Sequence, residues 1–110
     1  MAAEVRLVRL TCQRTEDTTG ADEAKLTYNG ETVFRTRIND GQTRTIGIVR
    51  RVNGQARVNL FDEDSPDADD FLGSITISES ELNQGSRSQD FTRDGANYTL
   101  FYRVSPLEDD

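Results

Sequence analysis

Apolar and polar residues alternate in short stretches along most of this chain, and turn residues separate the stretches. The last stretch shows the pattern plainly, because Tyr98, Leu100, Tyr102 and Val104 occupy every second position. Side chains of a β-strand point alternately to the two faces of a sheet, so this period predicts strands with one buried face. The predicted strands are Val5–Arg14, Ala24–Tyr28, Thr32–Arg37, Thr43–Val49, Ala56–Phe61, Leu72–Ser78, Ser88–Thr92 and Asn97–Val104.

Turn pairs of Asn or Asp followed by Gly lie between several of these stretches. Such pairs favour tight reversals in which the backbone takes positive φ. They are Asn29-Gly30, Asp40-Gly41, Asn53-Gly54 and Asp94-Gly95. Short strands with frequent turns, and no long helical period, predict an all-β fold, an eight-stranded antiparallel β-sandwich. Residues 1–107 are expected to form a single domain, and residues 108–110 a frayed acidic tail.

The predicted core collects the inward positions of these strands. Besides the alternating residues of the last strand, it includes Val58, Leu60, Ile75, Ile77, Phe34, Ile38, Ile46 and Ile48. The pair Leu7-Val8 breaks the alternation of the first strand, which predicts a β-bulge there. Cys12 is the only cysteine, so an internal disulfide is ruled out, and we expect a small buried side chain.

The composition narrows the classes of function. The 110 residues include 20 acidic and 13 basic side chains, and the formal net charge of −7 disfavours binding to nucleic acid. Histidine, the commonest general base, is absent. No apolar segment is long enough to span a membrane, and the first residues carry charge where a signal peptide would be apolar. We therefore expect neither a membrane span nor an export signal, and by default a cytoplasmic protein.

The run from Asp62 to Asp70 contains six carboxylates in nine residues, and predicted strands flank it on both sides. A folded domain that gathers so many like charges usually holds a cation, and oxygen ligands on a loop favour Ca²⁺. If each strand crosses the sandwich once, alternate connections share one end. The other acids of those connections are Glu16, Asp17, Asp22, Glu23, Asp40 and Asp94. An EF-hand does not fit the run, because Pro66 and Gly73 occupy its fifth and twelfth positions.

The spacing of the run resembles the third calcium loop of the C2 domain family. That loop has aspartates at its first, third and ninth positions, and Asp62, Asp64 and Asp70 match them ahead of Phe71-Leu72-Gly73. Upstream, the segment from Asp17 to Asp22 resembles the first calcium loop of the family. The chain is thus similar to a C2-like domain. The resemblance implies one to three Ca²⁺ ions, with Asp17, Asp22, Asp62, Asp64 and Asp70 as the metal ligands.

Simpler roles are expected for the remaining acids. Glu63, Asp67 and Asp69 are expected to face solvent and to add to the negative field. Asp40 and Asp94 each precede a glycine, where aspartate commonly serves a turn.

Calcium is expected to order the acidic loops of a binding module, serving a protein partner or the stability of the scaffold. The alternative is calcium-dependent docking on an anionic phospholipid membrane. The loop tips, Thr18-Thr19 and Ser65–Ala68, offer neither aromatic nor basic residues for such docking. An enzyme is not expected, and the alternative of that class is a metal-dependent hydrolase that uses a metal-activated water. A basic set, expected to be exposed on a sheet face, comprises Arg35, Arg37, Arg44, Arg50, Arg51 and Arg57.

Overall fold

The computed structural model describes residues 3–16, 20–63 and 68–107, and within them the chain is built of β-strands. These are β1 (Ala3–Arg14), β2 (Asp22–Tyr28), β3 (Glu31–Ile38), β4 (Thr43–Val52), β5 (Gln55–Asp62), β6 (Asp70–Ser78), β7 (Ser86–Phe91) and β8 (Asn97–Pro106). Short 3-10 turns, η1 (Glu79–Glu81) and η2 (Arg93–Gly95), precede β7 and β8. Every predicted strand is confirmed, and the observed bounds differ from the predicted ones by at most three residues.

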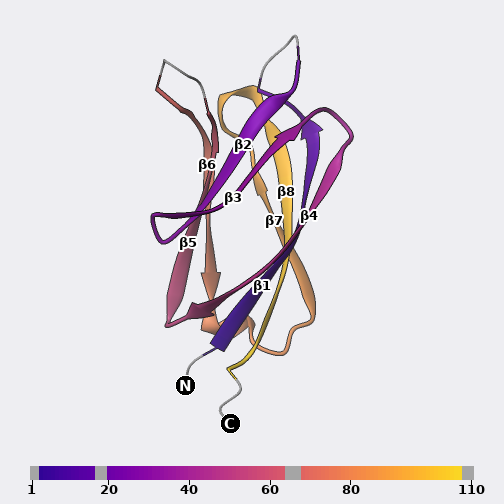
Figure 1. Cartoon of the computed structure of the whole chain (residues 1–110). Coiled ribbons are helices and arrows are strands. Elements are labelled where there is room, and N and C mark those ends of the chain that lie inside the picture. The colour runs from indigo at the N-terminus through magenta and orange to yellow at the C-terminus, as the bar shows by residue number, and fades with distance from the viewer. Residues whose placement is uncertain (1–2, 17–19, 64–67, 108–110) are drawn as a thin grey trace.

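The strands pair antiparallel in two layers (Figure 1). In the described part of the chain one sheet has the order β4-β1-β8-β7 and the other the order β3-β2-β5-β6. The predicted eight-stranded antiparallel sandwich is therefore confirmed. The strand ends that border the connections β1–β2, β3–β4, β5–β6 and β7–β8 lie at the end of the sandwich opposite the two termini (Figure 1). We call this end the acidic end, and the predicted sharing of one end by alternate connections is confirmed.

The core lies between the two sheets. The predicted core residues Val58, Leu60, Ile75 and Ile77 are buried, as is Cys12. The prediction is incomplete at the edges: Phe34 and Ile46 are only partly buried against the core, and Ile48 is half-buried outside it. These residues lie on the edge strands β3 and β4, whereas Ile75 and Ile77 on the edge strand β6 are buried, so an edge position alone does not set the burial.

The predicted bulge in the first strand is confirmed. The register of β1 shifts between Leu7 and Arg9 in its pairing with both β4 and β8. One extra residue in a strand re-aims the side chains that follow it. As a result Leu7 and Leu10 are both buried, whereas Arg6 and Arg9 are both exposed.

Positive backbone angles occur where the turn pairs predict them. Asn29 and Gly30 have φ of 50° and 88°, and Asp94 and Gly95 have φ of 58° and 82°. Gly73 is required for a different reason. At its φ of 139°, a Cβ atom would lie 3.2 Å from the Cα atom of Phe91, so this glycine allows β6 to approach β7 closely.

No helix among the described residues is long and apolar enough to cross a membrane, since the described helices are the three-residue turns η1 and η2.

Candidate metal centre

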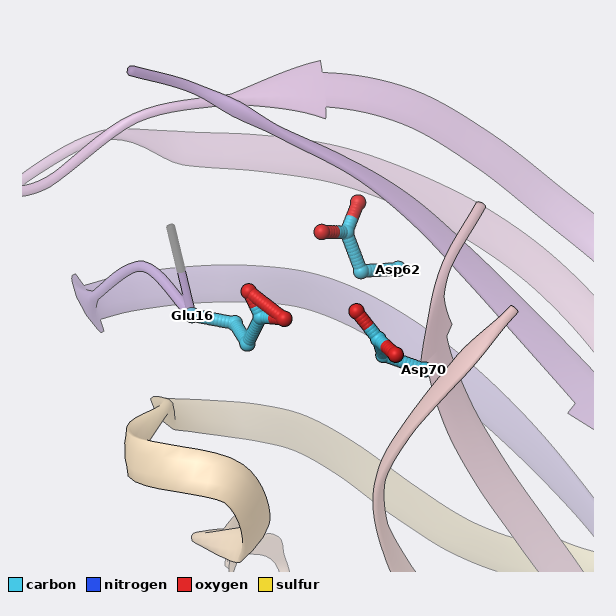
Figure 2. Close-up of side chains that lie close together, drawn as sticks. All are labelled: Glu16, Asp62 and Asp70. Carbon is cyan, nitrogen blue, oxygen red and sulfur yellow. The ribbon is translucent and has the colours of Figure 1, made fainter. Parts of the chain in front are cut away.

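Carboxylates from three strand ends converge at the acidic end (Figure 2). Glu16 follows β1, Asp62 closes β5 and Asp70 opens β6. In the described ranges, one carboxylate oxygen of each lies within 4.8 Å of the others. Two oxygens bound to the same Ca²⁺ lie at most about 5 Å apart, because each Ca–O bond is about 2.3–2.6 Å. These residues, which we call the converging carboxylates, therefore fit a shared calcium ion.

The sheet register forces two of them together. Asp62 and Asp70 are direct partners in the pairing of β5 with β6. Like charges directly opposite each other on neighbouring strands destabilise a sheet. Two carboxylates about 4 Å apart repel by about 1 kcal/mol in water and by about 4 kcal/mol at an effective dielectric constant near 20. A cation between the side chains would replace this repulsion with attraction.

Asp62 is held in place from the neighbouring strand. Its side chain is in the interior, with 2% exposure, and its Oδ1 accepts a hydrogen bond from the backbone N–H of Glu23 at 2.8 Å. The backbone N–H of Glu63 donates to the carbonyl oxygen of Glu23 at 2.8 Å. The beginning of β2 therefore fixes both the backbone and one carboxylate oxygen at the end of β5.

Asp22 is completely buried and holds the backbone of Glu16 in position through a hydrogen bond. Its Oδ2 accepts hydrogen bonds from the backbone N–H of Glu16 at 2.8 Å and from the hydroxyl of Tyr98 at 2.5 Å. A buried carboxylate needs such donors to offset its lost hydration. Asp22 thus links β8 to the segment that carries Glu16. These hydrogen bonds make it a positioning residue, and its role as a metal ligand stays a prediction.

Asp40 connects two of the loops. Its Oδ1 accepts a hydrogen bond from the backbone N–H of Thr15 at 2.8 Å, and the N–H of Gly41 donates to the carbonyl of Cys12 at 2.7 Å. These hydrogen bonds connect the β3–β4 turn to the end of β1, so Asp40 does more than the predicted turn role.

Beside Glu16 lies a hollow of about 480 Å³, lined by Arg14, Thr15, Glu16, Gly20, Asn39, Asp40, Asp94 and Gly95.

Two acids of the run have basic partners. Asp69 Oδ2 lies 2.6 Å from Lys25 Nζ, and Glu63 Oε1 lies 3.0 Å from Arg35 Nε. The expectation that both acids face solvent is incomplete: both side chains are partly exposed, and β2 and β3 bring basic side chains beside them. Asp67 lies outside the described residues. Lys25 and Arg35 therefore offset part of the negative charge of the described run.

The structure brings together only part of the predicted ligand set. It places Asp62 and Asp70 side by side, whereas Asp17 and Asp64 lie outside the described residues. Glu16 belongs to the converging carboxylates but was not predicted as a ligand. The sequence signal that could have indicated Glu16 is its position at the end of a predicted strand, immediately before Asp17. The aspartate spacing of the C2 family does not include this position.

An exposed aromatic side chain also lies at this end, although the loop tips themselves carry none. Phe71 lies in β6 next to Asp70 and is 39% exposed. Its ring centroid is 5.6 Å from that of Phe61, and the guanidinium carbon of Arg93 lies 5.6 Å from the Phe71 centroid. An exposed aromatic ring beside a cation is therefore present near the converging carboxylates, on a strand rather than at a loop tip.

The hydrogen bond to Asp22 has a consequence for pH dependence. Burial, followed by the hydrogen bond to Asp22, raises the pKa of Tyr98, and burial with the bond to Glu81 raises the pKa of Tyr102. Ionisation is thus favoured in the unfolded chain, where tyrosine has a pKa near 10. The stabilisation is complete below about pH 10 and is lost as the pH rises further, by about 1.4 kcal/mol per pH unit for each such tyrosine.

Urea unfolding between about pH 8 and about pH 12 measures this loss. Tyrosinate absorbance reports ionisation directly, because the chain has three tyrosines and no tryptophan. We expect tyrosinate from Tyr98 and Tyr102 to appear together with unfolding. Ionisation of all tyrosines in a protein that remains folded, with unchanged stability, would contradict the assignment.

Comparison with known proteins identifies the fold. No protein-family model and no curated protein sequence matches the chain. The C2A domain of plant Extended Synaptotagmin 1 superposes with a TM-score of 0.63 at 12% identity, over 98% of this chain and 96% of that one. The calcium-bound C2A and C2B domains of Extended-Synaptotagmin 2 give 0.57 at 23% identity, over 94% of this chain and 44% of that one.

Human GIVD cytosolic phospholipase A2, in complex with a fluorophosphonate inhibitor and terbium chloride, gives a TM-score of 0.56 at 19% identity. The match covers 98% of this chain but 18% of the phospholipase, so the catalysis of that enzyme is not part of the likeness. At these identities the matches establish architecture. The chain has the fold of a C2 domain, and the predicted C2-like sandwich is confirmed.

Proposed function

We propose that this C2-fold chain is a calcium-binding module whose acidic end is ordered by Ca²⁺. The observation that carries the proposal is the convergence of Glu16, Asp62 and Asp70, with oxygens within 4.8 Å of one another. Asp17 and Asp64, outside the described residues, are proposed as further ligands, for a total of one to three ions. The calcium bound in the Extended-Synaptotagmin 2 structure supports the choice of ion.

The chemistry of the donor set favours calcium over magnesium. Calcium accepts six to eight oxygens in a tolerant geometry, whereas magnesium demands a strict octahedron and keeps its waters. The described donors are carboxylates from separate strand ends, and Glu16 and Asp70 are partly exposed. Such ligands can adjust to a large ion while Asp22 and Glu23 hold the backbone behind them.

We propose that the ordered acidic end serves interaction with a protein partner or the stability of the scaffold. The charges favour this over membrane binding. The chain has a net charge of −7, and the nearby cations Lys25 and Arg35 are engaged with Asp69 and Glu63. Bound calcium would bring this end closer to neutrality, which gives only weak attraction to anionic lipid.

Calcium-dependent membrane docking is the second candidate, and the exposure of Phe71 beside Asp70 favours it. Sedimentation with phosphatidylserine vesicles, in EGTA and in CaCl₂, separates the two. Our proposal expects most of the protein to stay in the supernatant under both conditions. Strong calcium-dependent pelleting that Phe71→Ala abolishes would make membrane docking the function instead.

Calcium should raise the thermal stability of the domain. An ion that binds only the folded state adds about 2.7 kcal/mol at a hundredfold excess over its dissociation constant. For a chain of this size we expect the unfolding midpoint to rise by about 10 °C between EGTA and saturating CaCl₂. Differential scanning calorimetry measures the shift, and the same concentration of MgCl₂ should have little effect. Equal midpoints in EGTA and CaCl₂ would refute the ion site.

A further inference from the structure

The outer face of the β4-β1-β8-β7 sheet carries a second charged feature, of opposite sign. It is a groove of about 440 Å³, lined by Arg6, Val8, Arg9, Ser86, Arg103 and Ser105. These residues lie on β1, β7 and β8, with Arg6 near the start of β1 and Arg103 near the end of β8. Those strand ends lie at the end of the sandwich that carries the two termini (Figure 1). The groove is therefore separate from the converging carboxylates, and we call it the arginine groove.

The strand register places two like charges against each other in this groove. Arg6 is the direct partner of Arg103 in the pairing of β1 with β8, and Arg103 is in turn the direct partner of Ser86 on β7. Like charges opposite each other across strands are destabilising, so this arrangement acts against the stability of the sheet. It becomes favourable if an anion binds between the two guanidinium groups.

Two described acids, Glu4 and Asp90, lie on the strands that form this face. Glu4 is the direct partner of Arg51 on β4 and of the groove residue Ser105 on β8, and Asp90 accepts a hydrogen bond from the hydroxyl of Thr99 at 2.7 Å. Across the described ranges, neither Arg6 nor Arg103 forms an ion pair. The guanidinium groups of Arg6 and Arg103 are thus not paired with a described carboxylate.

A third guanidinium group is fixed beside this pair. The bulge after Leu7 brings Arg9 to the outer face, and its guanidinium carbon lies 4.1 Å from the ring centroid of Phe101. A cation over an aromatic ring at this distance is attracted to the ring face, which restricts the orientation of the side chain. Ser86 and Ser105 add hydroxyl donors to the lining.

We propose that the arginine groove binds a phosphate group of a phosphorylated ligand. Guanidinium groups present forked N–H donors that match the oxygens of a phosphate, and charge-assisted hydrogen bonds of this kind are strong. Arg6 and Arg103 hold the phosphate from two sides, Arg9 adds charge, and the serine hydroxyls donate to the remaining oxygens. Because the whole chain carries a net charge of −7, long-range attraction of an anion is not available and the contact must be local.

Isothermal titration calorimetry with inorganic pyrophosphate, in EGTA and about 0.15 M salt, tests the groove without involving calcium. We expect saturable binding to the wild-type chain and a loss of at least about tenfold in affinity for Arg6→Gln with Arg103→Gln. The matched control, Arg37→Gln with Arg57→Gln, removes the same charge from the other sheet and should bind like the wild type. Absence of binding, or an equal loss in both double variants, would overturn the proposal.

Two further variants keep the result interpretable. Arg103→Gln alone relieves the like-charge pair, so it should fold with an unchanged or higher midpoint in thermal unfolding and still lose affinity. Arg103→Lys keeps the charge but loses the fork, and a several-fold loss is expected. Wild-type affinity in the folded Arg103→Gln variant would contradict a phosphate contact at this residue.

The source of the phosphate is distinguished with vesicles. Phosphatidic acid exposes a phosphate monoester at a membrane surface, whereas phosphatidylserine supplies negative charge without one. Binding to phosphatidic acid vesicles and not to phosphatidylserine vesicles of equal charge assigns the groove to a lipid headgroup. Binding of pyrophosphate with no vesicle binding assigns it to a soluble phosphorylated ligand. Binding to both kinds of vesicle, unchanged by Arg6→Gln with Arg103→Gln, would contradict phosphate recognition by the groove.

Discussion

Replacement of Asp22 by alanine is expected to lower the stability of the domain by about 3 kcal/mol, which corresponds to a fall of roughly 12 °C in the unfolding midpoint. The Oδ2 atom of Asp22 accepts from two donors, the hydroxyl of Tyr98 and the backbone N–H of Glu16. The alanine variant leaves both donors without this acceptor, and a buried donor that loses its partner costs about 1–3 kcal/mol. Urea unfolding in EGTA measures the loss without a contribution from calcium.

Two variants test whether the loss of stability comes from the lost hydrogen bonds of Asp22 or simply from the removal of a negative charge. Asp22→Asn can place its amide oxygen where Oδ2 lies and keep both hydrogen bonds, so it should retain most of the stability. Asp90→Ala removes an exposed acid that accepts one hydrogen bond, from Thr99, and should change the stability by less than about 1 kcal/mol. If Asp22→Ala were as stable as Asp90→Ala, the positioning role of Asp22 would be wrong.

The double replacement Asp62→Asn with Asp70→Asn is expected to remove the stabilisation by calcium and to raise the stability in its absence. Asparagine keeps an acceptor for the backbone N–H of Glu23 but removes the charge that faces the ion. In EGTA the wild-type chain retains the repulsion between these opposed carboxylates, and the variant does not. We therefore expect the variant to be more stable in EGTA by about 1 kcal/mol and less stable than the wild type in saturating CaCl₂.

The same loop offers a matched control. Glu63→Gln with Asp69→Asn removes the same number of negative charges, but these acids are paired with Arg35 and Lys25. This control should keep the calcium-dependent rise in the midpoint and gain no stability in EGTA. Calorimetric scans of both double variants, with and without calcium, provide the comparison. A calcium-dependent rise of wild-type size in Asp62→Asn with Asp70→Asn would show that the ligands lie elsewhere.

Most of the fold could be predicted because the alternation of side chains is a local property. Tyr98, Leu100 and Tyr102 identify β8 and its inward face without knowledge of any neighbour, and these residues are buried. The degree of burial at Ile46 and Ile48 could not be predicted in the same way. It depends on how completely other strands cover β4, which is set by contacts between segments distant in the chain.

In the candidate site too, some residues could be predicted from local sequence and others could not. Asp62 and Asp70 belong to one short run, so their spacing indicates a shared ion, and the β5–β6 register places them opposite each other. The role of Asp22 depends on Tyr98, which is 76 residues away in the chain. The partners of Glu63 and Asp69 come from neighbouring strands, and the opposition of Arg6 and Arg103 exists only through the pairing of β1 with β8. Local spacing carries no information on such contacts.

Isothermal titration of CaCl₂ into the calcium-free chain tests the central claim, calcium binding by the converging carboxylates, most directly. The account predicts saturable binding to the wild-type chain, with no comparable binding of MgCl₂. It also predicts that Asp62→Asn with Asp70→Asn loses the binding, whereas Glu63→Gln with Asp69→Asn retains it. Absence of saturable binding to the wild-type chain, or binding of equal affinity in both double variants, would contradict the account.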